Sequence, residues 1–575
     1  MDNKYLLLTT IFFPTLGVIF MALFGQSGRA MIRTVALLVT AATFFLACVL
    51  INRFPADGSN ADRFAVAEID WFGSEGSGAL STFPRVQFGV GLDGLGVWLF
   101  GLSALLMVTA VLVSWNAIKE RPGLFYGMLL LLETGCLGVF AARDILLFYI
   151  FFEFTLIPLF FLVGIWGSEQ RRYAAIKFFL FTLAGSVLTF LGLLTIVLWD
   201  QQHSATRVMQ FSIPGLTASL AEHPMPLSLQ HWVFVALFAG FAIKVPLFPL
   251  HTWLPLAHVQ APTAGSVILA GVLLKIGTYG FLRFSIPMLP DASALFMPWI
   301  LWLSVGGIIY GALVALVQTD IKRLIAYSSV SHLGFCMLGL FAFNAQGVEG
   351  GTLQMINHGL STGGLFALVG MLYERYHTRE ISSYGGLARR APWLTFFMLI
   401  FTFSSIGLPG MNGFAGEFLI LMGMFQRAAA QAPPGLQNQL MTIAVLSVSG
   451  VVLGAWYMLW LIQRVFFGPL KEPQHESTGG TDTAHDSDSH AVTHSTAHHD
   501  DHHGSVDLCG REIFALMPLV IFIFWIGLQP HYFLRPMAPT LQRLTAGVER
   551  PLGVPASASA ESTSMNPGLA SATAR

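Results

Sequence analysis

The chain has 575 residues, of which 54% are hydrophobic and only 11% are charged, whereas charged residues make up about 25% of soluble domains. This composition excludes an ordinary soluble protein and predicts a polytopic membrane protein. The formal net charge of −1 gives neither a basic surface for nucleic acid nor an acidic surface for cationic partners. The four cysteines lack C-x-x-C spacing, so no disulfide, haem or iron–sulfur site is predicted.

Segments of about 20 apolar residues predict about fourteen membrane-spanning helices. They lie near residues 4–24, 30–51, 88–115, 122–141, 144–166, 174–199, 229–250, 262–284, 296–317, 324–342, 352–375, 393–427, 440–467 and 512–533. The first apolar run is too long for the core of a signal peptide, so we expect it to be retained. Arginine and lysine gather in the loops after odd-numbered helices, which places those loops in the cytoplasm and both termini outside.

Residues 53–87 form a predicted polar external loop, followed by a G-x-G-x-x-G pattern at Gly89, Gly91 and Gly94. A dinucleotide site is rejected because the pattern opens a predicted membrane helix and has no preceding strand or βαβ unit. Asp93, at the mouth of this helix, is expected to cap it or to anchor it to another helix.

Two predicted helices each carry one carboxylate within an apolar span. Glu153 lies in the middle of the fifth helix, and an unpaired carboxylate there is costly. We therefore expect it to face the bundle interior beside a cationic partner. Glu133 of the fourth helix either shares that role or is a protonated carboxyl satisfied by a neighbouring helix.

Lysine is found once in each of the seventh and eighth predicted helices, and the chain between them is rich in proline. Lys244 and Lys275 each cost about 2.5–3.5 kcal/mol at the centre of a membrane helix, which favours a functional role over snorkelling. Pro246, Pro249 and Pro255 predict a break a few residues after Lys244. Freed backbone groups need water or protein partners, so we expect a hydrated cavity beside this lysine.

Histidines on the tenth and eleventh predicted helices, His332 and His358, are flanked by small and polar residues. Each alone would be a satisfied core residue, but two on consecutive membrane helices indicate a proton relay, since imidazole both gives and takes a proton near neutral pH. The twelfth predicted helix breaks at 407–410 and carries Glu417 beyond the break.

The predicted fold is an all-α polytopic membrane protein with two inverted five-helix repeats, helices four to eight and nine to thirteen, whose seventh and twelfth helices are broken. The predicted units are 1–121 (three helices and the external loop), 122–284 (first repeat), 285–467 (second repeat), 468–511 (His-rich cytoplasmic loop) and 512–575 (last helix and disordered tail). The predicted polar row across the middle is Glu153, Lys244, Lys275, His332, His358 and Glu417.

Histidine, aspartate, serine and threonine dominate residues 471–510, which include HHDDHH at 498–503. Such tracts can bind Zn²⁺ or Ni²⁺ but lack the fixed spacing of a folded metal site. We interpret this segment as a disordered, solvated loop, with metal binding as the alternative, and assign no metal ligand.

Four stretches carry a specific resemblance: FYIFFEFTLIPLFFLVGIWG, KVPLFPLHTWLPLAHVQAPTAGSVILAGVLLKIGTYG, DIKRLIAYSSVSHLGF and GLPGMNGFAGEF. They resemble the antiporter-like membrane subunits of proton-pumping NADH:quinone oxidoreductase, respiratory complex I, over about residues 88–467. The chain is most similar to the M type, called subunit 4 in mitochondria, because Glu417 stands where the L and N types carry lysine. Gln260 departs from the family, in which many members carry glutamate.

The resemblance implies that Glu153 and Lys244 form the charge pair of a first half-channel. Lys275 would be the connecting lysine and Glu417 the terminal proton acceptor of a second half-channel. The relay positions would be His332 and His358, and two further histidines, His251 and His258, also match family histidines.

The resemblance further implies a proton-translocating subunit that moves H⁺ from cytoplasm to periplasm in a bacterial inner membrane, beside sister antiporter-like subunits and membrane lipids. No cofactor is expected in this chain, and FMN, iron–sulfur clusters, NADH and quinone would bind partner subunits. A multisubunit cation/proton antiporter and a membrane-bound hydrogenase-type complex remain alternatives.

Overall fold

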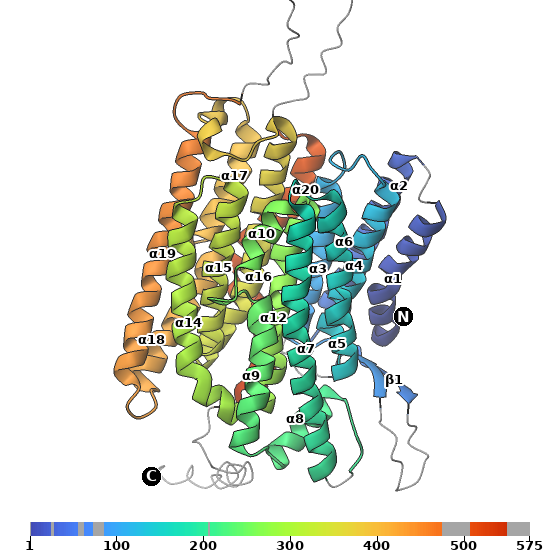
Figure 1. Ribbon diagram of the computed structural model, residues 1–575, viewed down its shortest axis with the longest axis vertical. Coiled ribbons are helices and arrows are strands. Elements are labelled where there is room, and N and C mark those ends of the chain that lie inside the picture. Colours follow the sequence, from blue (N-terminus) through green and yellow to red (C-terminus); the bar gives the residue numbers. More distant parts are fainter. Residues whose placement is uncertain are drawn as a thin grey trace, which may run out of the picture.

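The computed structural model describes residues 2–24, 28–55, 63–72, 86–204, 207–473 and 507–548. Its long helices run side by side along the vertical axis of Figure 1. Twelve helices within these residues are long and apolar enough to cross a membrane. The all-α polytopic fold predicted from the composition is therefore confirmed.

The N-terminal unit begins at one edge of the bundle, where its first two helices are shown in blue at the right of Figure 1, and its third helix is largely buried. Its elements are α1 (Asn3–Phe24), α2 (Arg29–Arg53), β1 (Ala67–Phe72), β2 (Val86–Val90) and α3 (Gly96–Val113). The two strands pair in an antiparallel hairpin with Ala67 opposite Val90. The predicted start of the third helix at residue 88 is wrong, because β1 supplies the backbone partners of residues 86–90 and two glycines disfavour a helix there.

Asp93 fulfils both of its expected roles. Its Oδ1 accepts a hydrogen bond from the backbone N–H of Gly96 at 2.8 Å, which caps the start of α3. Its two carboxylate oxygens also accept hydrogen bonds from Arg283 at 2.6 and 2.9 Å. Burial alone would raise the pKa of Asp93, but Arg283 and the Gly96 N–H together hold it below its ordinary value, so the carboxyl is ionised at neutral pH.

The next part of the bundle consists of α4 (Pro122–Ala141), α5 (Ile145–Phe154), α6 (Leu156–Trp166), α7 (Arg171–His203) and α8 (Ile213–Glu222). Asp144 begins α5, since its Oδ1 accepts hydrogen bonds from the backbone N–H groups of Leu146 and Leu147. Only Thr155 separates α5 from α6, so together they form the predicted fifth helix. The sequence did not predict α8, because a helix of 10 residues is too short to register as a span.

The seventh predicted helix is broken. α9 (Leu227–Lys244) ends at Lys244 itself, and α10 (Trp253–Gln260) resumes beyond the proline-containing segment 245–252. One long helix then spans Thr263–Met288, and its most apolar stretch is fully buried. It contains two π-helical stretches: its parts are α11 (Thr263–Ile268), η2 (Leu269–Leu273), α12 (Leu274–Gly280), η3 (Phe281–Ser285) and α13 (Ile286–Met288).

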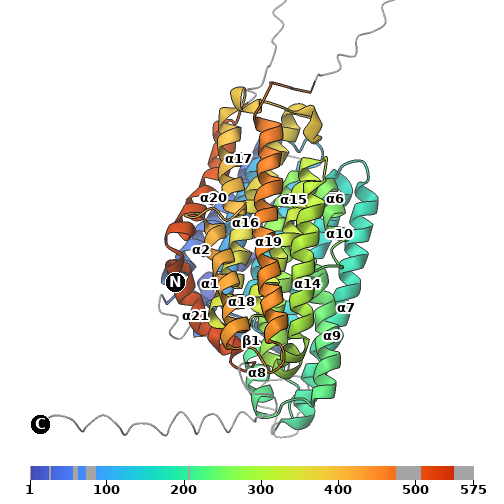
Figure 2. The same cartoon turned by 90° about the vertical axis from the view of Figure 1, so that its left-hand side faces the viewer.

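The second half places one helix in the middle of the bundle. Its elements are α14 (Pro290–Leu316), α15 (Ile321–Leu340), α16 (Ala345–Tyr376), the short turns η4 (Ile381–Ser383) and η5 (Leu387–Arg389), α17 (Pro392–Ser405), α18 (Asn412–Ala430) and α19 (Gln437–Phe466). α16 lies behind or between other helices in both views (Figures 1 and 2), and its apolar stretch is fully buried. The break between α17 and α18 contains Gly407 and Gly410, whose φ angles of 70° and 90° favour glycine.

The predicted last helix, 512–533, is two helices in the structure. α20 (Gly510–Leu528) ends at Gln529, and Pro530 begins α21 (Pro530–Thr545). Figure 2 shows α21 continuing from α20 along the outside of the bundle. The two predicted spans that fall outside the twelve correspond to α15 and to the pair α17 and α18, and their crossing of the membrane stays a prediction. The inverted repeat and the unit boundaries also stay predictions, and most of the His-rich loop and of the tail lie outside the described residues.

We expect Asp93→Asn to destabilise the bundle by about 3–5 kcal/mol, because it leaves the buried guanidinium of Arg283 without its anionic partner. The measurement is the thermal unfolding of the purified protein in detergent. Asp70→Asn is the control, since Asp70 is exposed in β1 and its Oδ1 accepts a hydrogen bond from Gln87. An unfolding temperature equal to that of the control would contradict the anchoring role.

Candidate functional site

A buried lysine and histidine contact each other at the centre of the bundle. Lys275 lies on α12 and is fully buried, and its Nζ lies 2.7 Å from Nδ1 of His358 on α16. Lys275 also donates a hydrogen bond to the backbone carbonyl of Ala270. That carbonyl belongs to the π-helical stretch η2, a departure from α-helical geometry that is frequent at functional sites.

His332 of α15 connects this pair to the carboxylate beyond the second helix break. The ring centroids of His332 and His358 are 5.8 Å apart. Nδ1 of His332 lies 3.2 Å from Oε1 of Glu417, and its Nε2 lies 3.1 Å from the hydroxyl of Ser405. Four of the six predicted row residues therefore lie in one continuous cluster.

Three further polar side chains support this cluster, and the sequence analysis did not single them out. Gln354 donates a hydrogen bond to Oε1 of Glu417 at 3.1 Å, and Asn357 donates one to Oε1 of Gln354 at 3.2 Å. The hydroxyl of Tyr457 lies 3.4 Å from Nε2 of His332. Gln354 was detectable, since it precedes His358 by four residues on one helix face. Tyr457 gave no such signal, because α19 is otherwise apolar around it.

A small polar cavity lies between the two histidines. Its volume of about 10 Å³ is close to the minimum for one water molecule. Its lining consists of polar side chains and one glycine: His332, Gln354, Asn357, His358, Ser361, Thr362, Ser404, Ser405 and Gly413. A water there would have several hydrogen-bonding partners.

The first half of the row is arranged differently. The Nζ of Lys244 stands 4.6 Å from the ring centroid of Phe152, in a cation–π contact. Lys244 and the neighbouring Glu153 interact electrostatically. Among the described residues no ion pair within 4 Å joins them, and Oε1 of Glu153 is buried without a hydrogen-bond partner. Glu153 and Lys244 are thus neighbours but do not form an ion pair in this conformation.

The three secondary candidates are buried outside the hydrogen-bonded cluster. Neither carboxylate oxygen of Glu133 has a partner within the described chain, so the expected neighbour that would satisfy a protonated carboxyl is not found there. His251 packs against Phe248 and Tyr310 in the break after α9. His258 stacks on an aromatic ring, and its two ring nitrogens have no partner in the parts that the structure describes.

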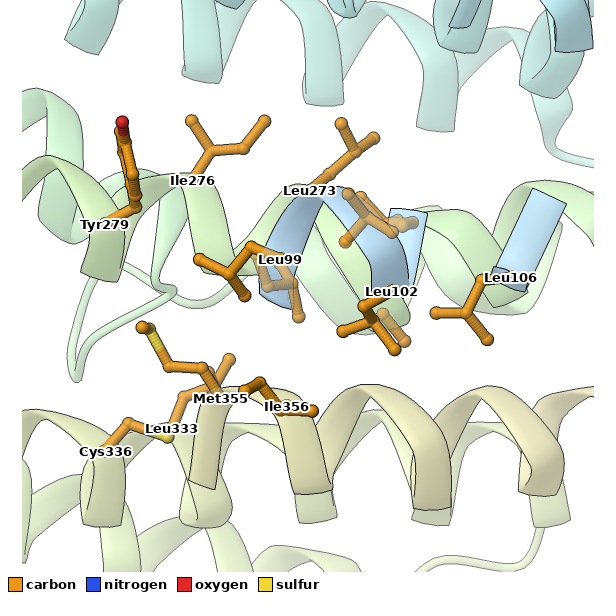
Figure 3. Close-up of a cluster of buried hydrophobic side chains, with 14 of the residues drawn as sticks. Leu99, Leu102, Leu106, Leu273, Ile276, Tyr279, Leu333, Cys336, Met355 and Ile356 are labelled. Carbon is orange, nitrogen blue, oxygen red and sulfur yellow. The ribbon is translucent and has the colours of Figure 1, made fainter. Parts of the chain in front are cut away.

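Apolar side chains surround the polar row. Figure 3 shows Leu99 and Leu102 of α3 lying between the long buried helix 263–288 and α16. Met355 and Ile356 of α16 face the same space. All four are buried, so charge in the cluster is separated from the N-terminal helices by a layer of low polarity.

Within the described residues no group of three His, Cys, Asp or Glu side chains could hold a metal ion. The histidine-rich tract at 498–503 lies outside those residues.

Buried lysine, histidine and glutamate beside interrupted membrane helices define a transport protein of the antiporter-like class. A family model described as NADH:quinone oxidoreductase/Mrp antiporter, transmembrane, matches residues 142–433. The chain belongs to this family.

Relatives extend the match to nearly the whole chain. The chain is 38% identical over 529 residues to NADH-ubiquinone oxidoreductase chain 4 of Chondrus crispus, and the alignment covers 92% of this chain and 95% of that protein. It is 37% identical over 537 residues to NADH-quinone oxidoreductase subunit M of Rhodobacter capsulatus, covering 93% and 94%. A chain of respiratory complex I from Thermus thermophilus superposes with a TM-score of 0.74 at 32% identity, covering 94% of this chain and 99% of that one.

We expect Gly277→Ala to disturb the junction of the two lysine-bearing helices. A Cβ at Gly277 would lie 2.7 Å from the carbonyl oxygen of Phe241 and 2.8 Å from the backbone nitrogen of Val245, so the end of α9 would have to move. The measurement is the unfolding temperature of the purified protein, which should fall. Gly265→Ala on the same helix is the control, because its Cβ would meet nothing closer than 3.4 Å. Equal effects of the two changes would contradict the close approach.

Proposed function

We propose that the chain is a proton-translocating subunit in the membrane arm of an NADH:quinone oxidoreductase. The observation that carries the proposal is the buried cluster from Lys275 through His358 and His332 to Glu417, in which neighbouring groups lie within hydrogen-bond distance or across one water-sized cavity. Lysine, histidine and glutamate can each hold or release a proton. The similarity to subunit M and chain 4 proteins supports the assignment to an NADH:quinone oxidoreductase.

The first half would control proton release by electrostatics. When Glu153 lies next to Lys244, its negative charge stabilises the protonated lysine. In the present conformation no ion pair joins the two among the described residues, and the Nζ of Lys244 lies over the face of the Phe152 ring. A buried ammonium with so little compensation loses its proton more easily.

The second half would carry the proton onward. Lys275 faces Nδ1 of His358, so a proton can pass from the ammonium to the imidazole along one hydrogen bond. A water in the small cavity would link the two imidazoles, and His332 faces the carboxylate of Glu417 directly. The hydrogen bond from Gln354 holds that carboxylate toward the histidine.

The proposed direction is from cytoplasm to periplasm in a bacterial inner membrane, with both termini periplasmic, as the distribution of arginine and lysine supports. The chain would have no redox centre of its own, and NADH oxidation and quinone reduction would occur in partner subunits. The family description also includes Mrp antiporters. Cation/proton exchange is therefore the alternative function.

We expect Glu153→Gln to lower NADH-driven proton uptake and NADH–quinone turnover together. The rate of proton uptake should fall by roughly 10²-fold. The reason is that the amide cannot supply the negative charge that Lys244 responds to. The measurement uses inverted membrane vesicles with equal amounts of assembled complex.

Glu169→Gln is the matched control, since Glu169 is an exposed carboxylate in the turn between α6 and α7. Unchanged redox and proton activities in Glu153→Gln, with loss of cation/proton exchange, would replace the complex I assignment by the antiporter function.

We expect Glu417→Gln to abolish proton uptake while leaving assembly intact. Glutamine fills the same space and its amide oxygen can still accept the hydrogen bond from Gln354, but it cannot accept a proton from His332. Proton uptake and the amount of assembled complex should be measured in the same vesicles. Normal pumping by this variant would remove Glu417 from the proton path.

A further inference from the structure

Two cavities adjoin each other on the N-terminal side of the bundle, away from the polar row. They share the lining residues Ile51, Asn52, Trp98 and Tyr532. The inner cavity has a volume of about 220 Å³ and the outer one about 650 Å³, and the outer volume is typical of sites for small-molecule ligands. Together they form one slot between α2, α3, α16, α20 and α21.

The inner cavity is apolar. Apart from Asn52 and a few polar atoms of aromatic and cysteine side chains, it is lined by hydrocarbon from five helices, including Phe44, Leu105 and Phe522. Trp98 is nine-tenths buried and its Nε1 has no hydrogen-bond partner among the described residues. A buried indole N–H without a partner is costly, which indicates that an acceptor from outside the chain completes this site.

The outer cavity combines apolar side chains with a few polar and basic ones. Gln529, His531 and Arg535, all at the start of α21, line it. His531 interacts electrostatically with Glu349 of α16, whereas Arg535 is exposed and forms no ion pair or hydrogen bond within the described parts of the chain. Arg535 is therefore free to bind an anion.

α21 itself has the pattern of a helix that lies in the membrane interface. Phe533, Met537 and Leu541 are buried against the bundle, while His531 and Arg535 are exposed. A basic polar face beside an apolar slot is the arrangement that binds phospholipid head groups and acyl chains.

We propose that this slot binds one anionic phospholipid, with an acyl chain in the inner cavity and the phosphate beside Arg535. An ester or phosphate oxygen of the lipid would accept the hydrogen bond of the Trp98 indole. The site lies apart from the polar row, since no residue of the row lines either cavity. The assignment does not depend on the proton path.

The test uses a phosphatidylglycerol whose acyl chain carries a diazirine, reconstituted with the complete purified complex. After illumination, cross-linked peptides are identified by mass spectrometry. We expect cross-links in α2 and α20 at residues that line the inner cavity, such as Cys48 and Phe522. Excess unlabelled phosphatidylglycerol should compete, and inorganic phosphate should not.

Arg535→Gln should lower these cross-links about tenfold, the effect of losing one charge-assisted hydrogen bond. Cys48→Trp, which fills the inner cavity, should remove them with Arg535 still present. Arg543→Gln is the control on the same helix, since its guanidinium hydrogen-bonds to Pro539 and Thr540 and lines neither cavity.

Three results would overturn the proposal. Equal cross-linking by phosphatidylcholine with the same acyl chain would exclude recognition of an anionic head group. Equal cross-linking in Arg535→Gln and Arg543→Gln would exclude the assigned contact. Absence of lipid cross-links from the residues that line the inner cavity would exclude an acyl chain there.

Discussion

A charged side chain inside a membrane bundle must be paired, hydrated or discharged, and the unusual backbone of this protein follows from that constraint. α9 stops at Lys244, whose buried ammonium lies over the ring of Phe152. The π-helical stretch η2 precedes Lys275 and offers it a backbone carbonyl. The break before α18 folds around Glu417 so closely that a Cβ on Gly407 would lie 3.1 Å from its Oε2.

The two halves of the polar row differ in how fully their polar groups are satisfied. In the second half, Glu417 and His332 each have two or more hydrogen-bonding neighbours, which fixes their orientation. In the first half, Glu153 has a buried oxygen without a partner and Lys244 rests on an aromatic ring. A poorly satisfied pair can change geometry at low cost, whereas a well-satisfied chain keeps its geometry. The geometry of the first half is therefore suited to a change of conformation, and that of the second half is suited to proton transfer along fixed hydrogen bonds.

The sequence was sufficient for the features that depend on residue type and periodicity. Apolar runs predicted the long helices, prolines and glycines lie where the chain leaves helical geometry after α9 and after α17, and the rare ionisable residues include the four that cluster around Lys275 and His332. It was insufficient where a contact depends on a partner far along the chain. β2 replaced the start of a predicted helix because β1 lay beside it. Tyr457 entered the cluster because α19 packs beside α15, which brings its hydroxyl near His332. α21 was missed because an amphipathic helix of 16 residues has no continuous apolar run.

The layer of buried apolar side chains on α3 and α16 also determines how strongly a change of charge in the cluster acts on groups beyond the layer. The hydrocarbon side chains of this layer contain few dipoles that could screen a charge, so the effective dielectric constant there is far below that of water. With an effective value of about 20, two unit charges 10 Å apart interact by about 1.7 kcal/mol, more than a tenfold change in an equilibrium constant. In bulk water the same pair would interact by only about 0.4 kcal/mol. A change of charge in the cluster therefore acts more strongly across this layer than it would across the same distance of water.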